Sequence, residues 1–141
     1  MDWQIIIQLF LATFLGALLG LEREYKRKGA GLQTYSLIAL GSCLFTITSF
    51  SLAKSIGFDP SPIFIAIGVG MGFIGAGAIF RGEPRIEGLT TAAGLWTTAA
   101  IGLTVGAGFY FFAIFTTLLA ILILAGFGLL EEKIFKRKTE E

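Results

Sequence analysis

Histidine is missing from this sequence of 141 residues, and there is only one cysteine, Cys43. The absence of histidine removes the side chain that most often serves as a general base, proton relay or zinc ligand. A single cysteine excludes a disulfide within the chain and a cysteine-rich metal site. Because Cys43 lies in an apolar stretch, we predict that it is a small packing residue.

Aspartate is also scarce, since Asp2 and Asp59 are the only two and neither lies inside an apolar stretch. The sequence therefore lacks the paired aspartates of an intramembrane protease, the Ser-His or Cys-His pair of a hydrolase and the P-loop of an ATPase. The net charge is only +1, and the sequence contains no basic patch of the kind that is typical of a DNA-binding surface. We expect no enzymatic activity, no bound cofactor and no nucleic-acid partner.

Apolar residues, by contrast, make up 55% of the chain, and the mean hydropathy is +0.80. They fall into five blocks, at residues 3–21, 34–53, 62–80, 89–106 and 109–130. At about 1.5 Å per residue each block approaches the ~30 Å core of a bilayer, the fourth only marginally. We predict an all-α integral membrane protein with one transmembrane domain over residues 1–141, a bundle of about five helices and a short tail at 131–141. The chain begins without a basic segment, so we interpret the first block as a retained helix and not as a signal peptide.

The basic residues are distributed unevenly between the two ends of this predicted bundle. Ten of the eleven Lys and Arg residues fall in the segments 22–33 and 81–88 and in the tail, whereas Lys54 lies at the opposite end. The positive-inside bias then predicts an N-terminus outside the cell and a cytoplasmic tail. An alternative, in which blocks three and four form a re-entrant hairpin, would place four charges of the 81–88 segment at mid-membrane. Unpaired, they would cost about 10 kcal/mol together, so we favour five crossings.

Block four carries sorted helical faces. Leu89, Trp96 and Leu103 recur every seven residues, and the remaining positions are small or hydroxylic. We therefore predict that this helix is central in the bundle. Thr97, Thr98 and Thr104 form a polar seam, for which two interpretations stay open: packing between helices, or the lining of an ion path.

Block three is rich in glycine. Gly68, Gly72 and Gly75 fall on one face, which allows close approach of helix backbones. The pairs Gly16 to Gly20 and Gly102 to Gly106 have the same spacing of four. The spacing does not distinguish packing within one chain from packing between two copies, and we expect a homodimer through such glycine faces.

Charged residues flank several helices at the end that we predict to be cytoplasmic. Glu22, Arg23 and Glu24 follow the first block, Arg81 follows the third, and Glu87 precedes the fourth. The topology brings them to one membrane face, where they could bind a cation, relay protons or form ion pairs. If a metal ion binds here, Mg²⁺ is the candidate, with Glu22, Glu24 and Glu87 as its carboxylate ligands.

Three stretches resemble the membrane domain of the MgtC/SapB family: Gly20-Leu21-Glu22-Arg23-Glu24, residues 72–79 and residues 88–103, which contain Gly-Leu-Thr-Thr-Ala-Ala and Trp96. The resemblance implies a five-helix, multi-pass protein of the bacterial inner membrane connected with magnesium homeostasis. For some members of the family, the resemblance also implies a role in survival inside host cells, through restraint of the membrane ATP synthase. It implies the short form of the family, without the C-terminal ACT-like domain that some members carry.

The sequence departs from the family pattern at the start of the second block. Where relatives commonly have Gly-Leu-Arg-Thr-His, this chain has Gly31-Leu32-Gln33-Thr34-Tyr35. A basic group and an imidazole are lost, which removes a proton or ligand role if the family uses one there. If the pair only anchors the helix, Gln33 and Tyr35 substitute for it by hydrogen bonding.

Two functional hypotheses follow. The first is a non-enzymatic membrane protein that tunes ion homeostasis or regulates a membrane partner, with a cytoplasmic working face made of Glu22, Arg23, Glu24, Arg81, Thr90 and Thr91. The second is a small dimeric transporter or channel that conducts a cation or protons along the polar seam.

Overall fold

The computed structural model describes residues 2–57, 59–82 and 86–129. Within them the chain is almost entirely helical, with the elements α1 Asp2–Tyr25, α2 Leu32–Ile56, α3 Ser61–Gly77, α4 Leu89–Gly106 and α5 Tyr110–Ile121. A π-helical segment, η1 (Leu122–Phe127), continues α5 without a break. Two short strands, β1 Phe80–Arg81 and β2 Ile86–Glu87, pair antiparallel between α3 and α4. The predicted all-α membrane bundle is confirmed.

Four of the helices are long and apolar enough to cross a bilayer, and α3 is a shorter apolar helix of 17 residues. The prediction that the third helix runs to residue 80 is wrong, because α3 ends at Gly77 and residues 80–81 form β1. The paired strands take up the backbone hydrogen bonds that a longer helix would have made. Conversely, α1 continues past the apolar block to Tyr25, since Glu and Arg are good helix formers. The end predicted for the fifth helix, residue 130, and the tail 131–141 lie outside the described residues.

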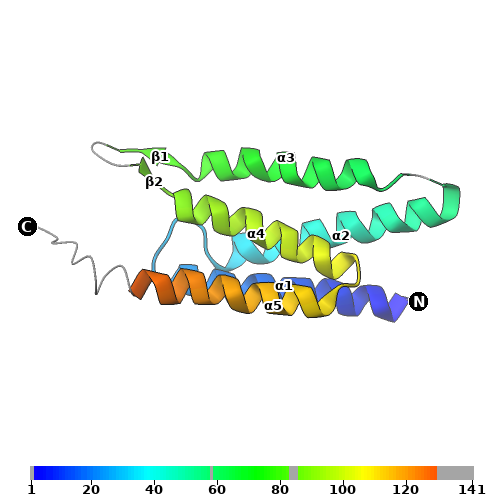
Figure 1. Cartoon of the computed structure of the whole chain (residues 1–141), viewed down its shortest axis with the longest axis horizontal. Coiled ribbons are helices and arrows are strands. Elements are labelled where there is room, and N and C mark those ends of the chain that lie inside the picture. Colours follow the sequence, from blue (N-terminus) through cyan, green and yellow to red (C-terminus); the bar gives the residue numbers. More distant parts are fainter. Residues whose placement is uncertain (1, 58, 83–85, 130–141) are drawn as a thin grey trace, which may run out of the picture.

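The helices run alternately up and down a single bundle (Figure 1). The α1–α2 connection, the β1–β2 hairpin and the end of η1 lie at one end, and the N-terminus lies at the other. We call the end that holds the α1–α2 connection the basic end, because the segment 22–33 and the described residues of the segment 81–88 lie there. This arrangement agrees with five crossings, whereas the side of the membrane that holds the basic end stays a prediction.

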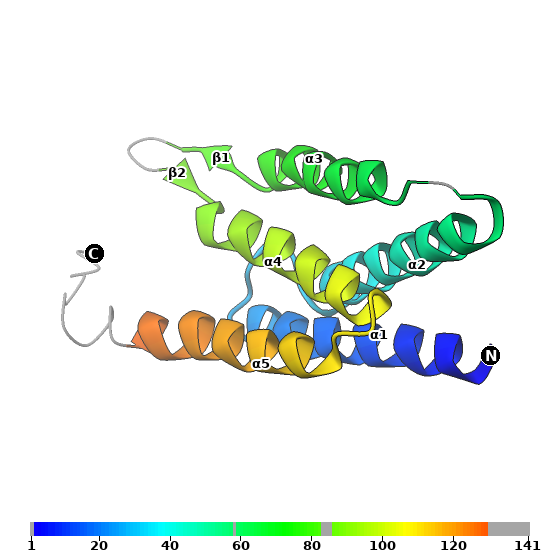
Figure 2. The same cartoon turned by 45° about the vertical axis from the view of Figure 1, so that its right-hand side comes forward.

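Helix α4 contacts α1, α2, α3 and α5, as predicted for a central helix. The helices α1 and α5 lie side by side on one side of α4, and α3 lies on the other side (Figure 2). In contrast to α4, α3 makes substantial contacts with only two of the described helices, α4 and α2. The bundle therefore has a close-packed part, made of α1, α2, α4 and α5, and one peripheral helix.

Glycine sets the close packing around α2. An added Cβ atom at Gly16 would lie 2.6 Å from the Tyr35 carbonyl oxygen, and one at Gly106 would lie 2.7 Å from the Cys43 carbonyl oxygen. At Gly102 it would collide with the Ala39 carbonyl. Both Gly-x-x-x-Gly pairs therefore pack within one chain, which answers a question that the sequence leaves open.

Candidate functional site

Arg23 is the buried charge at the basic end of the bundle, with 3% of its surface exposed. It belongs to the helical stripe Gln8, Ala12, Leu15, Leu19 and Arg23, in which every member is buried. The stripe carries the guanidinium against α4, where its Nη2 donates a hydrogen bond to the Thr91 hydroxyl at 2.8 Å. The Nε group is buried and has no hydrogen-bond partner among the described residues. Nη2 of this guanidinium is therefore anchored to α4, whereas Nε is left without a described hydrogen-bond acceptor.

Glu22 and Lys26 complete the charged cluster beside Arg23. The Lys26 ammonium lies 2.8 Å from Glu22 Oε1, and Arg23 Nη1 lies 3.7 Å from Glu22 Oε2. Both Glu22 carboxylate oxygens are buried and accept no well-aligned hydrogen bond from any residue that the structure describes. Ion pairing alone compensates this carboxylate, and two cations against one anion leave the cluster with one excess positive charge.

Lys26 also connects the cluster to the π-helical segment. Its Nζ donates a hydrogen bond to the Leu124 carbonyl of η1 at 2.8 Å, across 98 positions of sequence. An added Cβ atom at Gly128 would lie 2.9 Å from the same Nζ, so a small residue leaves room for the ammonium. Hydrogen bonds in a π-helix run to the fifth residue, and such segments within α-helices are often found at functional sites. The cluster thus ties the end of α1 to both α4 and η1.

Tyr35 is the second anchor on Thr91. It is fully buried, and its hydroxyl donates to the Thr91 carbonyl at 3.4 Å. The ring fits because Gly94 has no side chain, since an added Cβ atom there would lie 2.5 Å from the Tyr35 hydroxyl oxygen. Tyr35 therefore anchors α2 to α4 from inside the bundle. Gln33, the other residue that departs from the family pattern, is exposed.

The structure brings together three of the six residues predicted for the working face, namely Glu22, Arg23 and Thr91. Glu24 turns away and accepts a hydrogen bond from the Leu32 backbone N–H at 3.2 Å, closing the loop between α1 and α2. The other two residues of the predicted working face, Arg81 and Thr90, are exposed. Glu87, which lies opposite the β1 strand in the hairpin, is exposed as well.

The three carboxylates predicted as magnesium ligands do not converge. Glu22 is paired with cations, Glu24 bonds the backbone of α2, and Glu87 lies exposed in β2. Over residues 2–57, 59–82 and 86–129, no group of three His, Cys, Asp or Glu side chains is placed to hold a metal ion. The described part of the chain therefore does not support the proposed ligand set.

The threonines of the predicted polar seam are satisfied within their own helix. Thr97, Thr98 and Thr104 donate to the carbonyls four residues earlier, at 2.7 to 2.9 Å. Thr98 is fully buried, whereas the other two are only partly buried, so the three do not share one lining. This geometry favours the packing interpretation of the seam.

The residues predicted for packing separate into two groups. Gly75 contacts α4, since an added Cβ atom there would lie 3.6 Å from the Ala92 Cβ. Gly68 and Gly72 have no described neighbour within 4 Å of such an atom, and Trp96 is 56% exposed. Only Gly75 therefore packs within the described bundle.

A second buried polar contact, which we did not predict from the sequence, lies at the far end of α4. The Gln8 amide donates to the Val105 carbonyl at 3.1 Å, at the C-terminal end of α4. The last carbonyls of a helix lack partners within the helix, and Gln8 supplies a donor there. The signal was present in the sequence, because Gln8 lies on the same stripe as Arg23.

Comparison with known proteins places this site in a family. The chain is 44% identical to YhiD of Escherichia coli (strain K12) over 90% of its own length and 62% of that protein. It is 46% identical to SapB of Bacillus subtilis (strain 168) over 86% of its length and 55% of that protein. It is also 41% identical to MgtC of Salmonella typhimurium over 73% of its length and 43% of that protein.

The chain thus matches about half of the length of these curated relatives. No solved structure matches it significantly. The model of the MgtC family matches residues 9–133, which include α1 from residue 9 onward, all of α2 to α5 and every residue of the buried cluster. The chain belongs to the MgtC family.

Proposed function

We propose that this chain works in magnesium homeostasis as a non-enzymatic protein of the bacterial inner membrane, and that it acts on a partner protein without conducting the ion itself. Family membership supports the link to magnesium, because the Escherichia coli relative is named as a candidate magnesium transporter. The observation that carries the proposal is the charged cluster of Glu22, Arg23 and Lys26.

The charge of this cluster argues against a cation site. A divalent cation would have to approach one carboxylate that already has two cationic neighbours. At 4 Å, two like unit charges repel each other by about 4 kcal/mol at an effective dielectric constant of 20. The cluster is better suited to hold α1, α4 and η1 in one arrangement, and to respond when a partner contacts the basic end.

The interior of the bundle argues in the same direction. Gly16, Gly102 and Gly106 bring α1 and α4 against the backbone of α2. The hydroxyls of Thr98 and Thr104 in α4 donate to carbonyls of their own helix. Little polar surface is left inside the bundle to replace the water of a moving ion. The transporter hypothesis therefore requires a path between copies of the chain.

The partner in our proposal is another membrane protein. Among such proteins, the membrane ATP synthase is our candidate, because the family resemblance implies it for some members. Self-association is part of the proposal as well, through the open face of α3 at Gly68 and Gly72. A Gly72→Leu variant should then lose dimers that the wild type forms, as measured by light scattering in detergent.

Two measurements on the same variants test the proposal. One is growth of cells in low magnesium when the chain replaces the cells' own family member. The other is magnesium and proton flux into proteoliposomes that contain the purified chain. The informative variant is Arg23→Gln, and the matched control is Arg27→Gln, an exposed arginine of the same segment.

We expect the Arg23→Gln variant to lose growth in low magnesium, the Arg27→Gln variant to keep it, and no variant or wild type to give flux above empty liposomes. Wild-type flux that disappears in a Glu22→Gln variant would replace our proposal with the transporter hypothesis. Normal growth of the Arg23→Gln variant would show that the cluster has no part in the function.

A further inference from the structure

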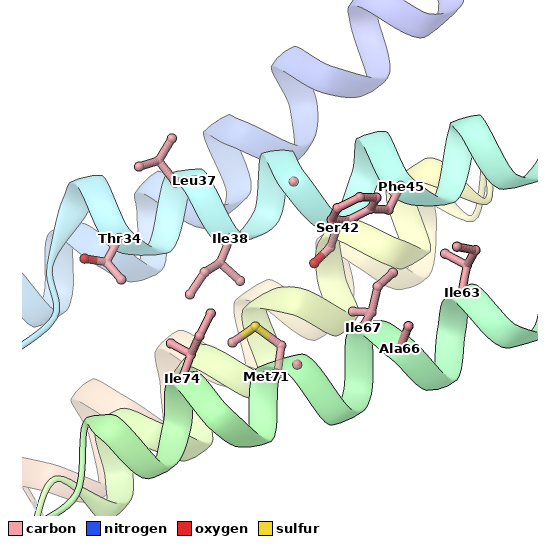
Figure 3. Close-up of a pocket in the computed structure, with 12 residues that line it drawn as sticks. Thr34, Leu37, Ile38, Ser42, Phe45, Ile63, Ala66, Ile67, Met71 and Ile74 are labelled. Atoms are coloured by element: carbon pink, nitrogen blue, oxygen red, sulfur yellow. The ribbon is translucent and has the colours of Figure 1, made fainter.

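An apolar groove lies between α2 and α3, on the side of the bundle away from α1 and α5 (Figure 3). Its volume is about 550 Å³, within the range of roughly 300 to 1,000 Å³ that small ligands occupy. It runs along α2 from Thr34 to Phe45 and along α3 from Ile74 to Ile63. Figure 3 shows side chains of both helices pointing into the space between them. We call this feature the α2–α3 groove.

The groove is open toward the surroundings of the bundle. Leu37 and Phe45, which line it, are 66% and 61% exposed. In a chain that crosses the bilayer these surfaces face lipid. Gly41 in α2 and Gly70 in α3 line the groove and have no side chain. An added Cβ atom at either position would have no described neighbour within 4 Å.

The length of the groove matches one leaflet of the bilayer. Each wall spans eleven residue steps of helix, which is about 16 Å at 1.5 Å per residue. Half of a ~30 Å hydrocarbon core is about 15 Å. Thr34 is the third residue of α2, so the groove begins near the basic end and ends near mid-membrane.

Positive charge lies just beyond the end of the groove that opens toward the headgroups. Lys28 precedes α2 and is exposed, and Arg81 follows α3 and is exposed. The two residues belong to the segments that form the basic end. An apolar channel one leaflet long with cations at its mouth is complementary to a lipid that has one apolar chain and an anionic headgroup.

We propose that the α2–α3 groove binds one acyl chain of an anionic phospholipid from the leaflet at the basic end, with the headgroup phosphate near Lys28 and Arg81. This site is independent of the magnesium function, because it shares no residue with the cluster around Arg23. The lipid fills the space between α3 and the close-packed part of the bundle, and so helps to hold the peripheral helix.

Two variants fill the groove without disturbing the bundle. In Gly41→Leu and Gly70→Leu, the new side chain extends from opposite walls into space that no described atom occupies. The matched control is Ala76→Leu, which places the same side chain on α3 at an exposed position that does not line the groove. Comparison of the three separates loss of the groove from a general effect of leucine on the helix surface.

The measurement is native mass spectrometry of the full chain, purified in mild detergent from membranes that contain phosphatidylglycerol. We expect phospholipid to remain on the wild type and on Ala76→Leu, and to fall about tenfold or more in both groove variants, because leucine occupies the site of the acyl chain. Equal retention in all four folded proteins, as judged by their elution as single species, would overturn the proposal.

Two further results distinguish the occupant. If the groove variants convert a dimer into a monomer and the wild type carries no phospholipid, then a second copy of the chain fills the groove and the proposal is wrong. A phosphatidylglycerol with a photoreactive acyl chain should label residues 34–45 and 63–74 of the unaltered protein. The Arg81→Gln variant should lower the preference for phosphatidylglycerol over phosphatidylcholine, while the total number of bound lipids stays unchanged.

Discussion

The helices α3 and α4 are both rich in glycine, but they use it differently. In α4, the glycines at 94, 102 and 106 each meet the side chain or backbone of α2 at a distance that leaves no room for a Cβ atom. In α3, Gly68, Gly70, Gly72 and Gly77 have no described neighbour within 4 Å of the position where that atom would be. The same residue type therefore permits helix packing in one place and leaves an open surface in another.

This difference matters for function, because it separates the close-packed part of the bundle from the peripheral helix. The buried cluster of Glu22, Arg23 and Lys26 lies in the close-packed part, where Thr91 of α4 meets two anchors. The α2–α3 groove lies between the close-packed part and the peripheral helix. Substitutions that should affect one helix and leave the other unchanged test the comparison directly.

The largest effect is expected from Gly102→Ala. The added methyl group collides with the Ala39 carbonyl, and since backbone lies on both sides, α2 and α4 must move apart. Overpacking of this kind costs about 1 to 3 kcal/mol and occasionally more. The matched variant Gly70→Ala should be neutral or stabilise α3 by up to about 1 kcal/mol, because alanine is the better helix former. Thermal unfolding midpoints in detergent measure both, and similar midpoints for the two variants would contradict the comparison.

The next effect is expected from Thr91→Val, which keeps the shape of the side chain and removes its hydroxyl. Arg23 then loses the acceptor 2.8 Å from Nη2, in addition to its unsatisfied Nε. A buried donor without a partner costs about 1 to 3 kcal/mol. The neighbouring Thr90 is exposed, so Thr90→Val should change the stability by less than about 0.5 kcal/mol. If unfolding in detergent responds equally to both, the contact does not stabilise the bundle.

A smaller and more local effect is expected from Lys26→Met. This change removes the ammonium that bonds the Leu124 carbonyl and pairs with Glu22, while the apolar part of the side chain stays. The Lys26 side chain is 26% exposed, so we expect a loss of about 1 kcal/mol after allowance for solvent. Hydrogen exchange of the amides in 122–127 should accelerate, whereas Lys28→Met, an exposed control, should leave it unchanged. Unchanged exchange in both would mean that Lys26 does not hold η1.

The sequence predicted the helices and the basic end, because both depend on properties that act locally. Long apolar blocks indicate membrane helices wherever they occur, and Lys and Arg at their ends indicate a side. The burial of Arg23 could also have been predicted, because Arg23 shares one helical face with Ala12, Leu15 and Leu19, which are buried. By its charge alone, Arg23 resembles Glu24 and Arg81, which are exposed; only its position on the helical face indicates burial.

Other features required the three-dimensional arrangement. The spacing of Gly102 and Gly106 is identical to that of Gly68 and Gly72, yet only the first pair meets another helix. The bond from Lys26 to Leu124 joins segments 98 residues apart, and no local pattern predicts which carbonyl an ammonium will contact. The β1–β2 hairpin was missed because its strands have two residues each, too few to produce a period in the sequence.

The smallest effect is expected at the start of α3, where Asp59 Oδ1 accepts a hydrogen bond from the Ser61 backbone N–H at 3.0 Å. This bond lowers the pKa of Asp59 below its ordinary value of 3.8. Because the folded-state pKa is depressed, the bond contributes stability above the ordinary value, and the contribution is lost as the pH falls through the folded-state pKa. An Asp59→Ala variant should therefore show faster amide exchange at the start of α3 at neutral pH, with a difference that shrinks on acidification. Since α3 is the peripheral helix, α4 should exchange equally in both proteins, and a change in α4 would mean that the two helices are coupled more tightly than their glycines indicate.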